Sequence, residues 1–256
     1  MSKIAVIQFP GSNCIKETIA ALHYVGAQAD IIRWNCDSET FHSYVAYILP
    51  GGFSYQDRVR AGAISAKLPI MTELIKANAE GKAILGICNG CQILAESGLV
   101  PDYADAQALD MALAPNTANG SMMGFVCDWV HVSVESPEKS LFTKCFSTDD
   151  IIPIPINHGE GRFVFSTLPN GQHAKMTYVN KTGELAHSFP LNPNGSTDAI
   201  AGLSNKNGNV FAMMPHPERA YLSQQVPRSL NTPWTEDSAF GPWHPLFKSL
   251  KEHVEG

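Results

Sequence analysis

Residues 82–96 join a short apolar run to a helical pattern through the turn Gly-Ile-Cys-Asn-Gly, and this stretch constrains the fold more than any other. The run from residue 83 to residue 87 has the length and apolar character of a buried strand. A buried strand that enters a helix through a glycine-flanked nucleophile is typical of a nucleophile elbow, here with Cys88 in place of serine. Gly86 and Gly90 would keep side chains out of the crowded turn. The stretch therefore predicts an α/β fold with Cys88 between a strand and a helix.

The same position predicts a reactive thiol. Free N–H groups and the helix dipole at a helix N-terminus stabilise a thiolate at Cys88. The backbone N–H of Asn89 would be one donor of an oxyanion hole. Cys91 completes a Cys-x-x-Cys redox motif, but the elbow explains Cys88 better, so we interpret Cys91 as a buried helix residue. A zinc site would need a second such pair, which the chain lacks, and we expect no metal.

In the first half of the chain, apolar runs alternate with helical patterns. Runs of strand length cover residues 4–9, 29–34 and 44–49, and helical patterns cover residues 15–25 and 69–80. This order predicts a parallel sheet with right-handed crossovers.

The second half carries more hairpin signals. Its strand-like runs cover residues 125–135, 151–156, 174–179, 199–203 and 210–214, and Asn207 with Gly208 forms a strong hairpin turn. Pro153 and Pro155 make residues 151–156 an edge strand or an extended segment. We expect a closing helix over residues 245–254 and irregular structure over 99–116, 157–163 and 231–241. The complete sheet should therefore be mixed.

Composition limits the class of protein. A chain of 256 residues suits one large α/β domain or two small ones, and we expect one domain over residues 1–256. The net charge of −6 gives no basic footprint, so we expect no nucleic-acid partner. No apolar run reaches the roughly 20 residues of a membrane helix, and the N-terminus is too short for a signal peptide. The six cysteines then indicate reduced thiols and a cytoplasmic protein.

A cysteine nucleophile needs a base, and the base needs an orienting partner. Among nine histidines, His216 follows an apolar run and precedes Pro217, which favours extended backbone. Alternate residues of an extended chain point the same way, so Glu218 should lie beside the imidazole and fix its tautomer. His158, with Glu160 two residues later, is the rival base. The glycine between those two imposes no extended geometry, and we interpret their loop as substrate-binding.

Two glycines follow the third apolar run, in residues 50–57 (Pro-Gly-Gly-Phe-Ser-Tyr-Gln-Asp). Paired glycines let the backbone approach a ligand closely, although a loop that needs positive φ explains them equally well. Ligands of open α/β sheets bind beyond the carboxyl ends of the strands. Because Cys88 ends its strand at the same edge, this position favours a ligand-binding role for Gly52.

The elbow and the late Pro-His-Pro-Glu segment resemble class I glutamine amidotransferases, which use a catalytic triad. The resemblance spans nearly the whole chain and narrows to the glutaminase subunits of phosphoribosylformylglycinamidine synthases. It implies a flavodoxin-like three-layer class I glutamine amidotransferase fold with a central mixed, mostly parallel sheet. The further matching segments are residues 8–13 (Gln-Phe-Pro-Gly-Ser-Asn), 51–55 (Gly-Gly-Phe-Ser-Tyr), 158–162 (His-Gly-Glu-Gly-Arg), 192–196 (Asn-Pro-Asn-Gly-Ser) and 213–219 (Met-Met-Pro-His-Pro-Glu-Arg).

The resemblance implies a role for each matching site residue. Cys88 attacks the side-chain amide of L-glutamine, His216 moves the proton to the leaving ammonia, and Glu218 orients His216. The backbone N–H groups of Gly52 and Asn89 hold the oxyanion, and water hydrolyses the γ-glutamyl thioester. The residues implied to bind glutamine are Ser54, Gln92, Asn157, Gly159 and Glu160.

The resemblance also implies a partner. Ammonia would pass to a separate synthetase subunit, with or without a third small subunit. That synthetase would convert formylglycinamide ribonucleotide to formylglycinamidine ribonucleotide in purine biosynthesis. ATP and magnesium would belong to the synthetase, and this chain would carry no cofactor. Two features depart from the family pattern: Gln56 stands where glycine is expected, and the loop of residues 121–125 (Ser-Met-Met-Gly-Phe) lacks the arginine expected before the phenylalanine.

Three other functions fit parts of the pattern. A free-standing cysteine hydrolase of γ-glutamyl compounds or peptides could use the same triad, and it would be active without a partner. A non-catalytic binding protein on this fold need not keep all three triad residues, whereas this chain has them. A Cys-x-x-Cys redox protein would lose its function without Cys91, whereas loss of Cys91 would perturb a glutaminase only mildly.

Overall fold

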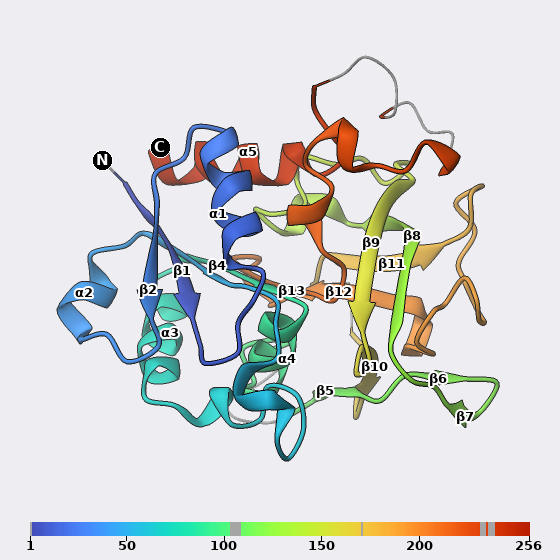
Figure 1. The fold of residues 1–256 in the computed structure, drawn as a ribbon, viewed down its shortest axis with the longest axis horizontal. Helices are drawn as coiled ribbons and strands as arrows, with labels where there is room; N and C mark the ends of the chain where they lie inside the picture. The colour runs from blue at the N-terminus through green and yellow to red at the C-terminus, as the bar shows by residue number, and fades with distance from the viewer. Residues whose placement is uncertain (1, 103–108, 170, 231–233, 235–238) are drawn as a thin grey trace.

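A nine-stranded mixed sheet forms the centre of the molecule (Figure 1). This computed structural model describes residues 2–102, 109–169, 171–230, 234 and 239–256. The strands of the sheet are β1 (Ile4–Gln8), β2 (Ala29–Arg33), β3 (Ala46–Leu49), β4 (Ala83–Ile87), β8 (Val126–Glu135), β9 (Ile152–His158), β11 (Lys175–Val179), β12 (Ile200–Ser204) and β13 (Val210–Met213). Their order across the sheet is β2-β1-β3-β4-β13-β12-β11-β8-β9.

The sheet has a parallel half and an antiparallel half. Strands β2, β1, β3, β4 and β13 are parallel neighbours. From β13 onward each strand is antiparallel to the next, through β12, β11, β8 and β9. Strands β11 and β9 thus run in the same direction as the five parallel ones, so seven of the nine strands share one direction. The predicted mixed, mostly parallel sheet is confirmed.

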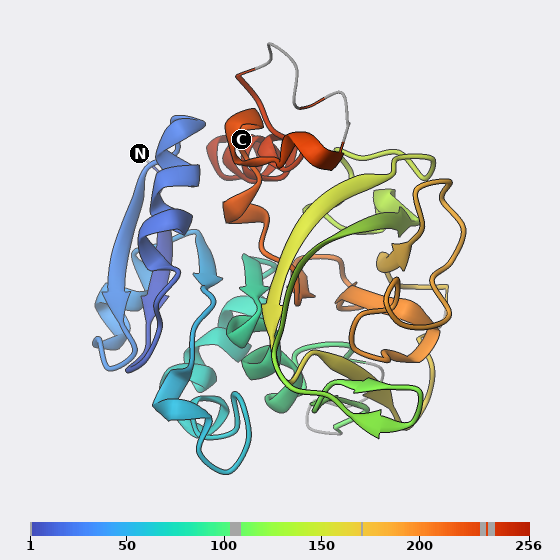
Figure 2. The ribbon, with the colours of Figure 1, turned by 45° about the vertical axis from the view of Figure 1, so that its right-hand side comes forward.

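Helices cover both faces of the parallel half. They are α1 (Ile15–Tyr24), α2 (Ser38–His42), α3 (Ile70–Ala79), α4 (Asn89–Glu96) and α5 (His244–Glu255). Right-handed crossovers place α1 on one face and α3 and α4 on the other. Helix α5 packs beside α1 and α3 beside α2, which completes the three layers (Figures 1 and 2). No helix among the described residues is both long and apolar enough to cross a membrane.

Several regions differ from the sequence-based expectation, among them helix α2. Residues 99–116 were expected to be irregular, but β5 (Met111–Ala114) pairs antiparallel with β10 (Arg162–Phe165). The expected loop 157–163 is shorter, because its first two residues end β9 and its last two begin β10. A short hairpin of β6 (Thr117–Ala118) and β7 (Ser121–Met122) follows β5. Most of the expected irregular segment 231–241, and residues 103–108, lie outside the described residues.

Strand β9 is the edge strand that the two prolines predicted. It pairs with β8 on one side, and together they curve across the molecule (Figure 2). On its open side the carbonyl of Pro155 accepts from the backbone N–H of His216 at 2.9 Å. The carbonyl of Pro153 accepts from the indole N–H of Trp243 at 3.0 Å. The open edge of β9 therefore carries the chain segment of His216 and the start of α5.

Candidate active site

Four loops meet at the carboxyl ends of the parallel strands. They follow β1, β3, β4 and β13, which are neighbours in the sheet. The loop after β4 is a single residue, Cys88, because α4 begins at Asn89. The loop after β13 contains His216. Strand order therefore brings together residues that are 128 positions apart in the sequence (216 − 88).

Cys88 has the strained backbone of a nucleophile elbow. Its φ is 51° and its ψ is −105°, a combination outside the usual allowed regions for a residue with a side chain. Its N–H donates to the carbonyl of Met213 at 2.8 Å, which joins the turn to β13. The side chain is buried, with 6% of its surface exposed. The thiol is therefore fixed at the N-terminus of α4, where free N–H groups favour negative charge.

The two glycines of the elbow are required by close packing. A Cβ on Gly90 would lie 2.0 Å from the carbonyl oxygen of Leu49 at the end of β3. A Cβ on Gly86 would lie 2.5 Å from a methyl carbon of Leu94 and 2.6 Å from the carbonyl oxygen of Gly90. Helix α4 therefore packs directly on the strand ends, and only glycine fits at either position.

His216 and Glu218 form a buried hydrogen-bonded pair. The Nδ1 atom of His216 lies 2.6 Å from Oε1 of Glu218, and the two side chains are 2% and 0% exposed. The predicted contact is therefore present. The local geometry differs from the prediction, because His216 is extended but Pro217–Arg219 forms a 3₁₀ turn. That turn, rather than a continued extended chain, brings the carboxylate back to the imidazole.

The surroundings of His216 favour its charged form. Burial by itself lowers the pKa of His216, but the negative charge of Glu218 and the sulfur atoms of Cys88 and Cys14 raise it. The outcome is a pKa well above the ordinary value of 6.5. An imidazolium that keeps one proton on Nδ1 for Glu218 has its other proton on Nε2. Among the described residues that nitrogen has no hydrogen-bond partner.

The thiol of Cys88 lies between β9 and His216. Its Sγ is 3.7 Å from the carbonyl oxygen of Asn157 on β9, and it is near enough to His216 to raise the pKa of the imidazole. Catalytic hydrogen bonds often tighten only when substrate is bound. The site therefore contains a thiol and an unpartnered imidazole nitrogen that come from neighbouring strand ends.

The backbone N–H groups of Gly52 and Asn89 donate no hydrogen bond to another described residue. The loop of Gly52 is held by its neighbours, because Phe53 N–H donates to the carbonyl of Gly11 at 2.9 Å. A Cβ on Gly52 would lie 2.7 Å from that same carbonyl oxygen, so glycine is required there. These two N–H groups are the predicted donors of the oxyanion hole.

A chain of hydrogen bonds joins most of the predicted glutamine-binding residues. The backbone N–H of Ser54 donates to Asn89 Oδ1 at 3.1 Å, and Asn89 Nδ2 donates to Gln92 Oε1 at 3.0 Å. Gln92 Nε2 then donates to the carbonyl of Glu160 at 2.7 Å. Gln92 is therefore used at both ends of its amide as a brace between α4 and the 159–161 turn. The hydroxyl of Ser54 is buried and has no partner among the described residues.

The remaining predicted residues lie around the same brace. Asn157 supplies the carbonyl nearest to Cys88. The carbonyl of Gly159 accepts from the N–H of Asn116 at 2.9 Å. The carboxylate of Glu160 accepts from the N–H of Ala61 at 3.2 Å. The 159–161 turn is thus tied to the loop that follows Gly52.

His158 does not pair with Glu160. It ends β9, is buried, and its Nδ1 lies 3.2 Å from Oδ1 of Asn116. Asn116 donates from its own Nδ2 to the carbonyls of His158 and Gly124, so Oδ1 must be the acceptor and His158 Nδ1 the donor. Burial, with the nearby charge of His216, lowers the pKa of His158 to about 3. His158 is therefore a neutral structural imidazole with no carboxylate to orient it as a base.

Sequence reasoning missed Cys14, Arg219 and Asp57. Arg219 Nη2 donates to Cys14 Sγ at 3.2 Å, directly beside the His216–Glu218 pair. Asp57 lies 3.5 Å from the side-chain amide of Asn89. Cys14 follows the matching segment 8–13 at the end of the first strand, and Arg219 follows Glu218. Their positions at the same sheet edge were the available signal.

One group of possible metal ligands occurs among the described residues. Ligand atoms of Cys14, His216 and Glu218 all lie within 4.8 Å of one another. The pair His216–Glu218 is already joined by a short hydrogen bond, and the guanidinium of Arg219 lies on the Cys14 sulfur. A cation there would face the positive charge of Arg219, so these donors fit a protein hydrogen-bond network better than a metal.

The six cysteines are free thiols. Cys91 is fully buried, and burial raises its pKa well above the ordinary value of 9.0. A thiol that resists deprotonation is a poor redox partner for Cys88. This argues against the Cys-x-x-Cys redox interpretation.

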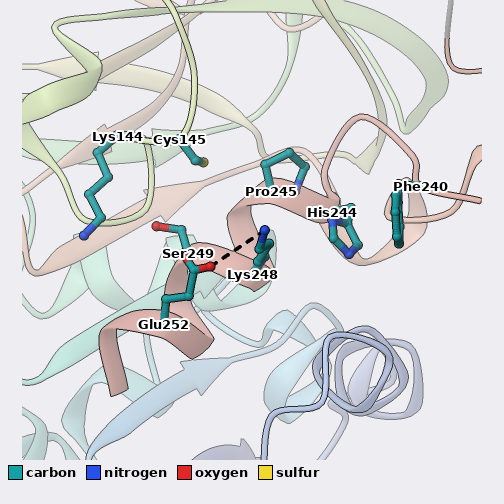
Figure 3. A pocket seen from close by; sticks show the side chains of 8 residues that line it. All are labelled: Lys144, Cys145, Phe240, His244, Pro245, Lys248, Ser249 and Glu252. Atoms are coloured by element: carbon teal, nitrogen blue, oxygen red, sulfur yellow. Dashed lines mark ion pairs between the residues drawn. The ribbon is translucent and has the colours of Figure 1, made fainter. Parts of the chain in front are cut away.

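A separate hollow of about 550 Å³ opens beside α5 (Figure 3). In the close view Lys248 points to Glu252, its ion-pair partner along the helix at 3.8 Å. The described lining residues include none of the predicted site residues: they are Lys144, Cys145, Phe240, His244, Pro245, Lys248, Ser249 and Glu252. A second hollow, of about 460 Å³, borders the loop of Gly52 at Pro10, Gly11, Tyr55, Gln56, Arg58 and Ile64.

Comparison with known proteins identifies similar chains over almost the full length. Residues 1–254 match the family model of the CobB/CobQ-like glutamine amidotransferase domain. A protein of Methanothrix thermoacetophila named phosphoribosylformylglycinamidine synthase subunit PurQ is 41% identical, with 99% of this chain and 98% of that protein covered. The protein of the same name from Pyrococcus horikoshii is 40% identical, with 86% and 90% covered.

Solved structures agree with these sequence matches. A chain of the PurLQS structure from Thermotoga maritima superposes with a TM-score of 0.77 at 34% identity, and 99% of each chain is covered. A glutamine amidotransferase of the same organism superposes with a TM-score of 0.54 at 17% identity, with 99% of this chain and 97% of that chain covered. The second similarity supports the fold alone.

Proposed function

The chain belongs to the CobB/CobQ-like glutamine amidotransferase family, and from this we propose that it is the glutaminase subunit of a phosphoribosylformylglycinamidine synthase. It hydrolyses L-glutamine to glutamate and ammonia. The ammonia goes to a synthetase that converts formylglycinamide ribonucleotide to formylglycinamidine ribonucleotide. One observation carries the proposal. The strained Cys88 follows β4, and the His216–Glu218 pair follows β13, the neighbouring strand in the sheet.

In the proposed first step, His216 Nε2 takes the proton of the Cys88 thiol, and Cys88 Sγ attacks the side-chain carbonyl carbon of glutamine. A carbon–sulfur bond forms, and the carbonyl oxygen takes up the negative charge. The N–H groups of Gly52 and Asn89 then donate to that oxygen, because they have no other described acceptor. The strain at Cys88 fixes the sulfur before substrate arrives, so little ordering remains for the reaction itself.

In the second step, the tetrahedral intermediate expels ammonia. His216 Nε2 gives its proton to the amide nitrogen as the carbon–nitrogen bond breaks, and a γ-glutamyl thioester remains on Cys88. His216 then takes a proton from the attacking water, and glutamate is released. Glu218 keeps its hydrogen bond to Nδ1 throughout and stabilises the imidazolium. The three residues thus divide into a nucleophile, an acid–base group and an orienting partner.

We propose Ser54, Gln92, Asn157, Gly159 and Glu160 as the glutamine-binding residues. Two of them offer polar groups that the protein leaves available. The hydroxyl of Ser54 has no described partner. Oε1 of Glu160 can accept a hydrogen bond from the substrate, since the N–H of Ala61 donates to Oε2. Gln92 acts through its brace to Glu160.

The partner is proposed from the relatives. The name of the Thermotoga maritima structure, PurLQS, is consistent with an assembly of more than one subunit. We propose a synthetase subunit as the acceptor of ammonia, with or without a third small subunit. ATP and magnesium would bind to that partner, and no cofactor is proposed for this chain.

Substitution of the nucleophile tests the proposal. In the complex with its synthetase, Cys88→Ala should abolish formylglycinamidine ribonucleotide synthesis from glutamine while synthesis from added ammonium chloride continues. The matched control is Cys127→Ala, which removes an exposed thiol on β8 and should leave both reactions intact. Glutamine-dependent synthesis by Cys88→Ala would reject the mechanism. Full glutaminase activity without the synthetase would instead indicate a free-standing hydrolase.

A further inference from the structure

Cys14 is a buried thiol beside the catalytic pair that the mechanism above does not use. It lies between β1 and α1 and is 2% exposed. Its backbone N–H and that of Asn13 both donate to the carbonyl of Gly51, at 3.1 and 3.2 Å. Gly51 directly precedes the proposed oxyanion donor Gly52. The backbone of Cys14 is therefore tied to the oxyanion loop.

The sulfur of Cys14 is tied to the turn that carries the base. Arg219 Nη2 donates to Cys14 Sγ at 3.2 Å, and the backbone N–H of Arg219 donates to the carbonyl of His216 at 3.2 Å. The same Nη2 lies 3.8 Å from Glu17 Oε1 on α1. Arg219 thus connects the turn Pro217–Arg219 to α1 through two acceptors, the carboxylate of Glu17 and the sulfur of Cys14.

Cys14 also packs against the imidazole. A Cβ on Gly51 would lie 2.8 Å from His216 Cε1 and 3.0 Å from Cys14 Sγ. Glycine is therefore the only residue that fits between the sulfur and the ring edge. Ligand atoms of Cys14, His216 and Glu218 lie within 4.8 Å of one another, in a region closed to solvent.

Resting on the proposed glutaminase function, we propose that Cys14 is a positioning residue for the catalytic base. Its sulfur holds the guanidinium of Arg219 and the edge of His216 at once. It thereby sets the imidazole against the oxyanion loop, with Nε2 free for Cys88 and the substrate.

The second oxygen of Glu218 explains why an acceptor at position 14 matters. Glu218 Oε2 is buried and has no partner among the described residues. Glu218 and Arg219 already interact through their charges. Without the Cys14 sulfur, the guanidinium of Arg219 would keep only carboxylates as acceptors, Glu17 and Glu218, since a charge-assisted bond to a carboxylate is stronger than one to sulfur. A closer approach to Glu218 would draw negative charge away from His216. Cys14 therefore keeps Glu218 for the imidazole.

The pKa of His216 gives a readout that packing alone would not change. The groups acting on the imidazole are Glu218, Cys88, Cys14 and the neutral His158, and Arg219 contacts the Cys14 sulfur. Glu218 and the two sulfur atoms raise the pKa of His216 against the effect of burial. Removal of the Cys14 sulfur takes away one of these contributions. The pKa of His216 should fall, and the imidazolium needed to protonate ammonia should be lost at a lower pH.

The experiment compares Cys14→Ala and Cys14→Ser in the complete synthase complex. Glutamine hydrolysis is measured as kcat and KM between pH 6 and 10. Cys14→Ala should lower kcat about tenfold to a hundredfold, the size typical for loss of a residue that orients a catalytic group, with KM within about twofold. The alkaline limb of kcat should move to lower pH. The serine hydroxyl can also accept from Arg219, so Cys14→Ser should recover much of both effects.

Arg219→Met provides the second variant. If Cys14 acts through Arg219, the two losses should not add. The double variant Cys14→Ala/Arg219→Met should then have a kcat no lower than that of the less active single variant. Cys145→Ala, a partly buried thiol beside α5, is the matched control and should leave the pH profile unchanged. An unchanged kcat and alkaline limb in Cys14→Ala would overturn the inference. So would additive losses in the double variant, or a loss that Cys14→Ser does not recover at all.

The outcomes separate this inference from the function on which it rests. If the wild-type complex does not hydrolyse glutamine, the proposed function fails. If the wild type is active and Cys14→Ala matches it at every pH, only the role of Cys14 fails. Ammonia-dependent synthesis should be equal in all variants, which checks that the synthetase itself is unchanged.

Discussion

At the scale of single residues, Cys88 combines the position of the proposed nucleophile with backbone strain. A non-glycine residue at φ 51° and ψ −105° costs about 1–3 kcal/mol. The strain persists because the close packing at Gly86 and Gly90 and the hydrogen bond to Met213 fix the backbone conformation of the turn. The protein therefore gives up stability in order to hold the sulfur at the N-terminus of α4.

This strain can be measured by comparing two substitutions that both remove the thiol. Cys88→Gly accepts the positive φ without a Cβ, whereas Cys88→Ala keeps the strain. We expect the free energy of unfolding of Cys88→Gly to exceed that of Cys88→Ala by about 1 kcal/mol, after the greater chain entropy of glycine is subtracted. Urea denaturation followed by circular dichroism measures both. A less stable glycine variant would show that the turn stores no strain.

Asp57 makes stability depend on pH. Burial and the negative charge of Glu160 raise the pKa of Asp57 from 3.8 to about 6. A carboxyl whose pKa is raised by folding binds its proton more tightly in the folded state, so it weakens stability as pH rises from about 4 to about 6. Asp57→Asn should therefore be more stable than wild type at pH 7.5 by about 1 kcal/mol, since solvent reduces the effect at this half-exposed site.

The same comparison at pH 4.0 should show much less difference, because the folded wild type then carries a neutral Asp57. Thermal unfolding at the two pH values tests this. A gain in stability that is equal at pH 4.0 and pH 7.5 would contradict the assignment of the effect to the carboxylate charge.

Sequence reasoning reached the residues of the proposed triad but not everything around them. Cys88, His216 and Glu218 stand in local patterns of glycine and proline that the sequence displays. Cys14 carries no such local pattern, and its contact with Arg219 depends on where β1 and β13 lie in the sheet. Residues whose surroundings are set by the local chain could be predicted, and those set by sheet order could not.

At the scale of elements, the join between β4 and α4 depends on one close approach. Gly90 leaves only enough room for a hydrogen beside the carbonyl of Leu49. Gly90→Ala should lower the free energy of unfolding by about 3 kcal/mol, because backbone atoms on both sides must move, and glutaminase activity should be lost. Gly124→Ala is the control, since nothing lies within 4 Å of its added Cβ. Equal stability of the two variants would mean that α4 can shift freely on β3.

Some elements were hidden in the sequence for identifiable reasons. The run Met111–Ala114 alternates methionine and leucine with alanine, and alanine on the partly exposed face obscures the period of a strand. Helix α2 has only five residues, too few for a helical period to show. Its one signal is Asp37, whose side chain accepts from the N–H of Thr40 at 2.7 Å as an N-cap. Long periodic elements were predictable, and short elements fixed by tertiary pairing were not.

At the scale of the whole molecule, Trp243 joins the C-terminal helix to the antiparallel half of the sheet. It is fully buried, and its indole N–H donates to Pro153 on β9. Trp243→Phe removes that donor and part of the buried surface, so it should lower the free energy of unfolding by about 2–3 kcal/mol. Trp34→Phe, at a partly exposed position, should cost less than about 1 kcal/mol. Urea denaturation measures the free energy of unfolding of both variants. Equal losses in Trp243→Phe and Trp34→Phe would contradict this contribution of Trp243.

The open edge of β9 also bears on how this protein behaves in a crowded cell. Successive peptide groups of a strand point to alternate sides. Residues 153 and 155 turn their carbonyls away from β8, toward Trp243 and His216, and as prolines they present no N–H on that side. At these two residues a foreign strand would therefore find no donor and no free acceptor, which disfavours extension of the sheet into an aggregate. Mutations at these two prolines should reduce the yield of soluble protein and also disturb the placement of His216, the proposed catalytic base. Selection for solubility and selection for activity would then act on the same two codons.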